Sequence, residues 1–169
     1  MNYKLIFIDM VKDYALDIFK SETFLKEKEF HHHGKISTYE HSINVAYIAL
    51  KIAIKLNIKV DYRSLLRGAL LHDLYLYDWH KYEKRHRFHG FKHARFAYIN
   101  ASKEFNLNKI EKDIILKHMF PLNIIPPLFK ESYIVTLADK ISTLLESMKI
   151  FKLNYDQIAL SLKLKFSTK

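Results

Sequence analysis

The 169-residue chain contains no cysteine and only three glycines and three prolines. Without cysteine it can form no disulfide, and Cys-ligated zinc and iron–sulfur sites are excluded. So little glycine and proline leaves few residues for hairpins and tight turns, which argues against a β-sandwich or a β-barrel. The absence of cysteine also fits a reducing compartment, so we expect a cytoplasmic protein.

Long apolar segments are missing as well. No uninterrupted run approaches the roughly 18 residues that suggest a membrane span. The apolar patch near the N-terminus is broken at once by Asp9, Lys12 and Asp13 and has no small-residue cleavage site, so we expect no signal peptide. The sequence also has no glycine-rich phosphate loop and no Gly-x-Ser-x-Gly elbow. We therefore expect a soluble protein with no membrane partner.

The composition that remains is globular and basic. Hydrophobic residues make up 49% and charged residues 27%, which is typical of a folded chain and fits one domain over residues 1–169. Lys and Arg number 28 against 18 acidic residues, a formal net charge of +10. This excess favours an anionic partner such as a nucleotide, a nucleic acid or a membrane surface, and charge alone does not choose among them.

Apolar residues recur at three- and four-residue steps along most of the chain, which predicts helices. Ser37 and Glu40 form a capping-box signature at the start of one helix, with a stop near Asn57. Asp61 can cap a second helix over 62–77, which is apolar on most sides and should lie at the centre. Prolines predict a loop over 121–127. Further helices are expected over 90–105, from 108 onward, and over 130–150 and 154–166. The predicted fold is all-α, a compact bundle of about six to eight helices.

Several polar residues stand in apolar surroundings. His72 and Asp73 interrupt the run GALLHDLYL, and Asp139 interrupts YIVTLADKISTLL. A buried carboxylate must be paired, hydrogen-bonded or bound to a metal, because burying it alone is very costly. Each of these residues taken singly is more often a satisfied core group. Together with His41, in the first turn of its own helix, they indicate one metal site built from several helices.

These residues, with their flanking words EHSINVA, GALLHDL and TLADK, match a His…His-Asp…Asp pattern in order and spacing. Over roughly residues 35–150 the chain resembles the HD superfamily of metal-dependent phosphohydrolases. The resemblance implies a helical HD domain that holds one or two divalent ions on His41, His72, Asp73 and Asp139. Iron or manganese is favoured, and magnesium, nickel, cobalt and zinc are compatible with such ligands.

Many HD proteins hold a second ion on additional histidines. By resemblance to the His-x-x-x-small-Ala word of the two-metal enzymes, His89 is the first extra ligand expected here, and His118 is the second. With two ions, Asp73 would bridge them. His93 follows His89 by four residues and shares its helix face, so it is either an alternative ligand or a catalytic proton donor that contacts phosphate.

The resemblance implies hydrolysis of a phosphate ester or anhydride by metal-activated water, with a small phosphorylated substrate, most simply a nucleotide. The basic segment 80–95 lies between two proposed ligand groups, and Arg suits bidentate phosphate contact. We therefore expect Arg85, Arg87, Lys92 and Lys140 to contact substrate. The Leu-Tyr-Leu-Tyr that follows Asp73 disfavours the Gly-Tyr-Pro type of cyclic-dinucleotide phosphodiesterase. The alternative is a noncatalytic module that binds nucleotide or RNA through its basic surface.

Overall fold

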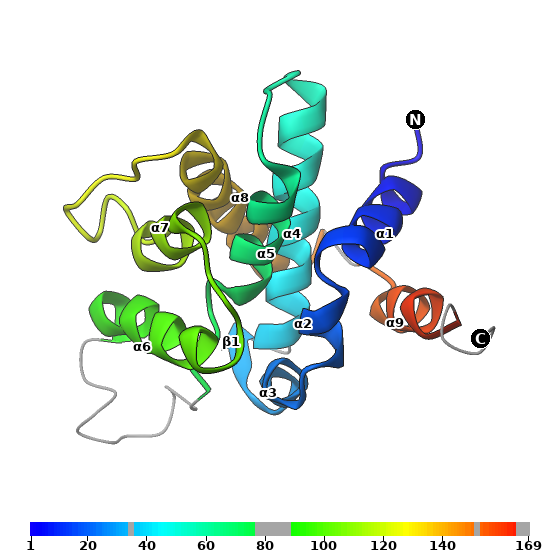
Figure 1. Cartoon of the computed structure of the whole chain (residues 1–169), viewed down its shortest axis with the longest axis horizontal. Helices are drawn as coiled ribbons and strands as arrows, with labels where there is room; N and C mark the ends of the chain where they lie inside the picture. The colour runs from blue at the N-terminus through cyan, green and yellow to red at the C-terminus, as the bar shows by residue number, and fades with distance from the viewer. Residues whose placement is uncertain (34–35, 77–88, 151–152, 165–169) are drawn as a thin grey trace.

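The computed structural model of the chain describes residues 1–33, 36–76, 89–150 and 153–164, and this part is all-α, as predicted (Figure 1). Within it the strands β1 (His31–His33) and β2 (Ile36–Ser37) pair antiparallel, and a 3₁₀ helix, η1 (Lys26–Glu29), precedes them. The short helices α2 and α3 bring the number above the expected six to eight. The nine α-helices of the described residues are α1 (Tyr3–Tyr14), α2 (Leu16–Lys20), α3 (Glu22–Leu25), α4 (Thr38–Lys55), α5 (Tyr62–Leu71), α6 (His89–Glu104), α7 (Lys109–Lys117), α8 (Lys130–Ser147) and α9 (Tyr155–Leu164).

The predicted helix starts are confirmed by the caps. Ser37 Oγ accepts the Glu40 N–H at 3.2 Å, and the Glu40 carboxylate accepts the Ser37 N–H at 2.9 Å. Asp61 caps α5, and Asn108 forms a second capping box with Glu111 at the start of α7. These caps satisfy N–H groups that the first turn of a helix leaves without a partner, so the sequence signature has a local cause.

The predicted end of the central helix is wrong. α5 ends at Leu71 and not near residue 77, and His72 is its C-cap. The His72 imidazole hydrogen-bonds the Ala69 carbonyl at 2.7 Å, and Leu76 has a φ of 57°, outside the right-handed helical region. His72 and Asp73 therefore lie in the turn that follows the helix, not on two successive helical positions.

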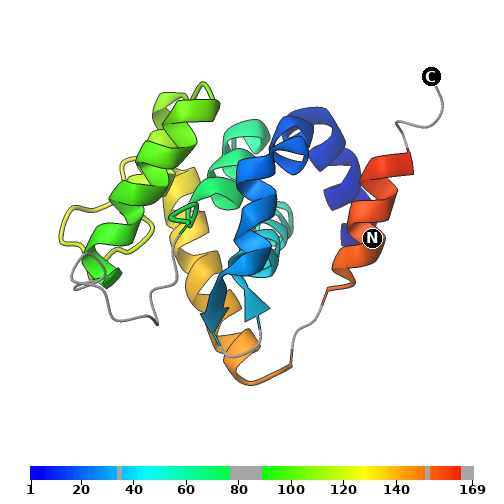
Figure 2. The same cartoon turned by 90° about the horizontal axis from the view of Figure 1, so that it is seen from below.

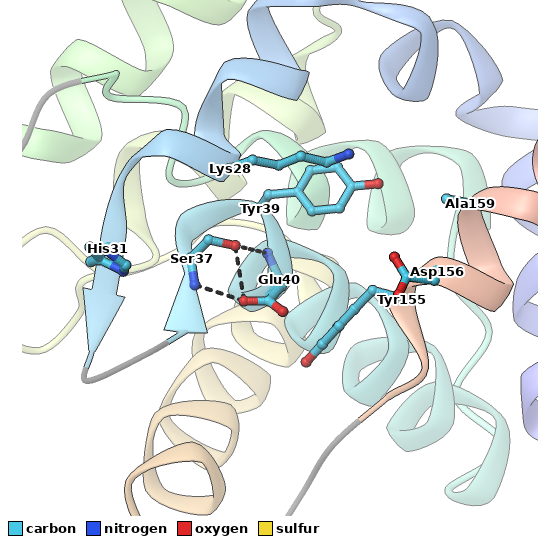
Figure 3. Close-up of a pocket in the computed structure, with 8 residues that line it drawn as sticks. All are labelled: Lys28, His31, Ser37, Tyr39, Glu40, Tyr155, Asp156 and Ala159. Atoms are coloured by element: carbon cyan, nitrogen blue, oxygen red, sulfur yellow. Dashed lines mark hydrogen bonds between the residues drawn. The ribbon is translucent and has the colours of Figure 1, made fainter.

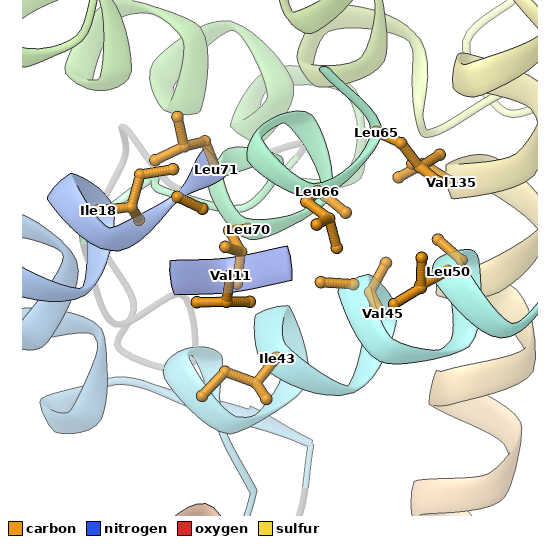
Figure 4. Packing of buried hydrophobic residues seen from close by; sticks show 14 of the residues in the cluster. Val11, Ile18, Ile43, Val45, Leu50, Leu65, Leu66, Leu70, Leu71 and Val135 are labelled. Carbon is orange, nitrogen blue, oxygen red and sulfur yellow. The ribbon is translucent and has the colours of Figure 1, made fainter. Parts of the chain in front are cut away.

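The central position of α5 is as predicted. It packs against α1, α4, α6, α7 and α8, and all of its residues from 64 to 71 are buried. Figure 4 shows Leu65, Leu66, Leu70 and Leu71 among apolar side chains of α1, α4 and α8. At Gly68 a Cβ atom would collide with Ile114 of α7, so glycine allows these two helices to approach closely.

The remaining helices surround this centre. α4 and α8 pack along each other and against α5, and α6 packs mainly on α7. α9 lies beside α1 at one end of the molecule (Figure 2). Within the described ranges, no helix combines the length and the apolar character that crossing a bilayer requires.

Candidate metal centre

The structure brings together side chains from three helices and from the residues that directly follow two others. His41 lies in the first turn of α4, and Asp139 lies in the middle of α8. His72 and Asp73 follow the end of α5, and His118 follows the end of α7. His93 lies on α6, and like the other five it is buried. The sequence elements that carry them are far apart, so the convergence is a product of helix packing.

His72 is held as a neutral imidazole with one nitrogen facing the cluster. Its Nδ1–H donates to the Ala69 carbonyl at 2.7 Å, while its Nε2 has no hydrogen-bond partner among the residues that the structure describes. Burial lowers the pKa of His72 to about 4. The Nε2 atom, 3.6 Å from Asp73 Oδ2, therefore carries no proton. Its lone pair is free to bind a metal ion, which requires an unprotonated nitrogen.

His118 repeats this arrangement at the end of α7. Its Nδ1–H donates to the Ile115 carbonyl at 2.9 Å, and its Nε2 lies 3.4 Å from Asp73 Oδ1. In both histidines the accepting carbonyl lies three residues earlier, where the last turn of a helix leaves carbonyls without a helical partner. Burial lowers the pKa of His118, but hydrogen bonding and the charge of Asp73 outweigh burial and raise it. Two helix ends thus aim two imidazoles at one carboxylate.

His41 lies between carboxylates on both sides. Its Nε2 is 3.1 Å from Asp139 Oδ1 and 3.9 Å from Asp73 Oδ2, and its Nδ1 is 3.0 Å from Glu146 Oε2. Burial lowers the pKa of His41, but the hydrogen bonds to Asp139 and Glu146 outweigh it and raise the pKa to about 10. The same pairing holds the pKa of the Asp139 carboxyl below its usual value, against the effect of burial. A divalent ion would compete with the proton on Nε2, so acid should weaken its binding.

The donor atoms fall into two groups that share Asp73. The first group is His41, His72 and Asp73, and the second group is Asp73, His93 and His118; within each, the ligand atoms lie within 4.8 Å of one another. Nitrogen and oxygen donors at about 2.0–2.2 Å from one ion lie roughly 3–4 Å apart. The histidine-to-Asp73 distances of 3.3–3.9 Å agree with this spacing. The residues therefore fit divalent ions, and Asp73 lies where its carboxylate could bind an ion in each of the two groups.

His93 is the α6 histidine whose described side chain lies in the cluster. Its Nε2 lies 3.3 Å from Asp73 Oδ1 and 2.8 Å from His118 Nε2. His89 is the first residue of α6, but its side chain lies outside the described residues. Its assignment as a ligand therefore stays a prediction.

Of the four predicted substrate contacts, the structure describes two. Arg85 and Arg87 lie outside the described residues. Lys92 is exposed on α6, next to His93. Lys140 is also exposed, and its Nζ lies 3.4 Å from the backbone carbonyl of His118. The contacts of these four residues with substrate stay predictions.

Of the buried carboxyl groups that escaped the sequence analysis, two interact with the cluster. Glu146 follows Asp139 by seven residues on α8, two helical turns, and this spacing could have revealed it. Glu27 belongs to η1, and neither of its oxygens has a hydrogen-bond partner among the described residues. Burial, and then the charge of Asp73, raise the pKa of Glu27 well above 4.5. Its surroundings in the sequence, LKEKEF, are those of an exposed charged turn and carry no signal of burial.

A surface pocket lies apart from the cluster. It has a volume of about 320 Å³ and lies between the β1–β2 hairpin, the start of α4 and α9 (Figure 3). Its lining includes Lys28, Tyr39 and Asp156, and also Glu40, whose carboxylate caps α4. None of the metal-ligand candidates lines it, so it is a feature separate from the cluster.

A helical fold that delivers buried histidines and aspartates from several helices to one cluster defines a class of metal-binding α-helical domains. The family model of the HD domain matches residues 38–144, a span that contains both ligand groups and Asp139. The chain therefore belongs to the HD-domain family, whose superfamily comprises metal-dependent phosphohydrolases that bind divalent ions. No curated protein and no solved structure matches the chain.

Proposed function

We propose that this protein is a metal-dependent phosphohydrolase acting on a nucleotide or another small phosphate ester or anhydride. The observation that carries the proposal is the buried cluster in which the unprotonated Nε2 of His72 faces the Asp73 carboxylate. A purely structural histidine would use both ring nitrogens, because a buried polar atom without a partner costs stability. A metal ion gives that lone pair a partner.

The residues of the cluster would have two roles, metal binding and the orientation of the metal ligands. The proposed ligands of one ion are His41, His72, Asp73 and Asp139, and those of the other are Asp73, His93 and His118. Divalent ions, when bound, lower the pKa of water from about 15.7 towards 7 and neutralise charge on phosphoryl oxygens. The Nδ1–H donations of His72 and His118 to backbone carbonyls keep each Nε2 turned inward, which holds the ligand tautomer.

The proposed substrate is anionic because the chain carries a formal charge of +10. Lys140 supports this, since this exposed residue has its ammonium group 3.4 Å from the backbone carbonyl of His118, a proposed ligand of the second ion. A lysine there adds a positive charge for a phosphate oxygen without occupying a metal position. Nucleotides are anionic phosphate esters and anhydrides, and they are the substrates to test first.

The test begins with protein purified without chelator. We expect one to two equivalents of bound iron or manganese by elemental analysis. Protein reloaded with Mn²⁺ should release phosphate or a nucleotide from at least one member of a panel of mononucleotides, dinucleoside polyphosphates and cyclic dinucleotides. Asp73→Ala should lose both bound metal and activity while its far-UV circular dichroism stays that of a helical protein.

The matched control is Asp9→Ala, since Asp9 is an exposed carboxylate on α1 that pairs with Lys12 in the same helix and belongs to neither ligand group. It should keep wild-type metal content and activity. Full activity in Asp73→Ala would show that the assignment is wrong. Metal-free wild-type protein with tight, salt-sensitive RNA binding would favour the noncatalytic module instead.

A further inference from the structure

His41 uses its two ring nitrogens for different partners. Nε2 faces the candidate ligands Asp139 and Asp73, whereas Nδ1 faces Glu146, with distances of 3.0 and 3.2 Å to the two carboxylate oxygens. Glu146 is the next-to-last residue of α8 and is buried. A carboxylate at Nδ1 favours the proton there, so the Nε2 lone pair is directed at the ion.

Glu146 is itself held in place by two neutral donors. Asn44 Nδ2 donates to Glu146 Oε1 at 2.7 Å from α4, and Ser142 Oγ donates to the same oxygen at 2.7 Å from one turn earlier on α8. Both donors are fully buried. With these bonds and the one from His41, the carboxylate has a defined orientation and cannot rotate without leaving a buried donor unpaired.

The chain of contacts continues to the C-terminal helix. Tyr155, the first residue of α9, donates its hydroxyl proton to Asn44 Oδ1 at 2.9 Å. A carboxylate only accepts hydrogen bonds, so Glu146 takes the donating Nδ2 end of the Asn44 amide, and Oδ1 faces Tyr155. The tyrosine hydroxyl donates to Oδ1 and so holds the amide in this orientation.

We infer that Glu146, oriented by Asn44 and Tyr155, is the positioning residue that directs His41 Nε2 at a metal ion. The inference rests on the proposed metal site. It adds a chain of hydrogen bonds that connects this site to Tyr155 of α9. Glu146 and Tyr155 both lie beyond residue 144, outside the span that the HD-domain family model matches. This part of the support is therefore supplied by residues outside the matched span.

A role in folding stability alone explains the arrangement less well. Buried ion pairs contribute little net stability, because desolvation of the two charges offsets their attraction. Glu131, near the other end of α8, is a buried carboxylate whose contact is purely structural. It accepts a hydrogen bond from the Asp61 N–H at 2.9 Å, at the start of α5. It offers a matched comparison on the same helix.

The experiment measures metal binding and not turnover. Zn²⁺ affinity is determined by isothermal titration calorimetry for the wild type, Glu146→Gln, Tyr155→Phe and the control Glu131→Gln. We expect Glu146→Gln to weaken affinity about 10- to 100-fold, as is usual for such supporting carboxylates. Tyr155→Phe removes one neutral hydrogen bond and should weaken it about 2- to 10-fold. Glu131→Gln should leave affinity within about twofold of the wild type.

A second readout separates positioning from stability. In Zn²⁺-loaded protein, the ¹⁵N signal of His41 Nδ1 should carry a slowly exchanging proton, and Glu146→Gln and Tyr155→Phe should speed that exchange whereas Glu131→Gln should not. Circular dichroism identifies a variant that fails to fold, in which case the milder Tyr155→Phe decides. Wild-type affinity and exchange in both site variants would overturn the inference. Wild-type protein that binds metal but cleaves no phosphate ester would overturn the proposed function alone, and protein that binds none would overturn both.

Discussion

The two ligand groups differ in how firmly the protein holds their histidines. In the first group, His41 has a carboxylate at each ring nitrogen, and it joins the two longest helices of the described residues, α4 and α8. In the second group, Asp73 is the carboxylate within reach, and the Nε2 atoms of His93 and His118 lie only 2.8 Å apart. More negative charge and more supporting bonds favour tighter metal binding. The comparison predicts that the first group binds its ion more tightly than the second.

The largest effect should come from removing one histidine from each group. His72→Ala should abolish the tighter binding event, whereas His118→Ala should keep one tightly bound equivalent and lose the other. Calorimetric titration with Mn²⁺, supported by elemental analysis, measures the number of sites directly. Loss of the tight site in His118→Ala would reverse the order that the comparison assigns, and two full equivalents there would remove His118 from the proposed ligands.

The next effect concerns α6. His93→Ala should lower the metal affinity of the weaker site by at least about tenfold. Removing a direct ligand should weaken binding no less than removing a residue that supports a ligand. His89→Ala, one turn earlier, is the matched variant: loss of affinity there would confirm the predicted His89 ligand, and an unchanged site would exclude it. If only His89→Ala weakens the site, His93 is left as the predicted proton donor, and His93→Ala should then lower turnover with metal content intact.

The smallest effect should come from a buried carboxylate outside both groups. Asp113 accepts hydrogen bonds from the Leu128 N–H at 2.8 Å and from Ser132 Oγ at 2.7 Å, and it pairs with Lys117 at 2.8 Å. Burial raises the pKa of Asp113, but these partners outweigh it and bring the pKa below 3.8. Asp113→Asn should therefore cost about 1–3 kcal/mol of folding stability at pH 7 and leave the metal content unchanged.

The sign of its pH dependence follows from the lowered pKa. The charged form is favoured in the folded state, so the stabilisation is complete above pH 3.8 and is lost as the pH falls through the folded pKa. Urea unfolding at a series of pH values should show the difference between wild type and Asp113→Asn shrinking below about pH 4. A difference that stays constant into acid would show that the charge of Asp113 is not what stabilises the fold.

Local signals in the sequence explain why the starts of three helices are predicted correctly. The helix starts at Ser37, Asp61 and Asn108 are short-range hydrogen-bond patterns, so a few adjacent residues are enough to reveal them. The end of α5 was misplaced for a related reason: apolar residues continue to Leu76, and what ends the helix is the turn that follows His72. Hydrophobic periodicity does not register such a turn.

The sequence by itself determined the helical class and singled out His41, His72, Asp73 and Asp139, because a charged or imidazole side chain in an apolar run must have a partner wherever the helices pack. It could not place His93 beside Asp73 or find Glu27 and Glu146. Those depend on where α6, η1 and the end of α8 lie relative to Asp73 and His41. Only the tertiary structure decides such distances, because they join residues up to 105 positions apart in the chain.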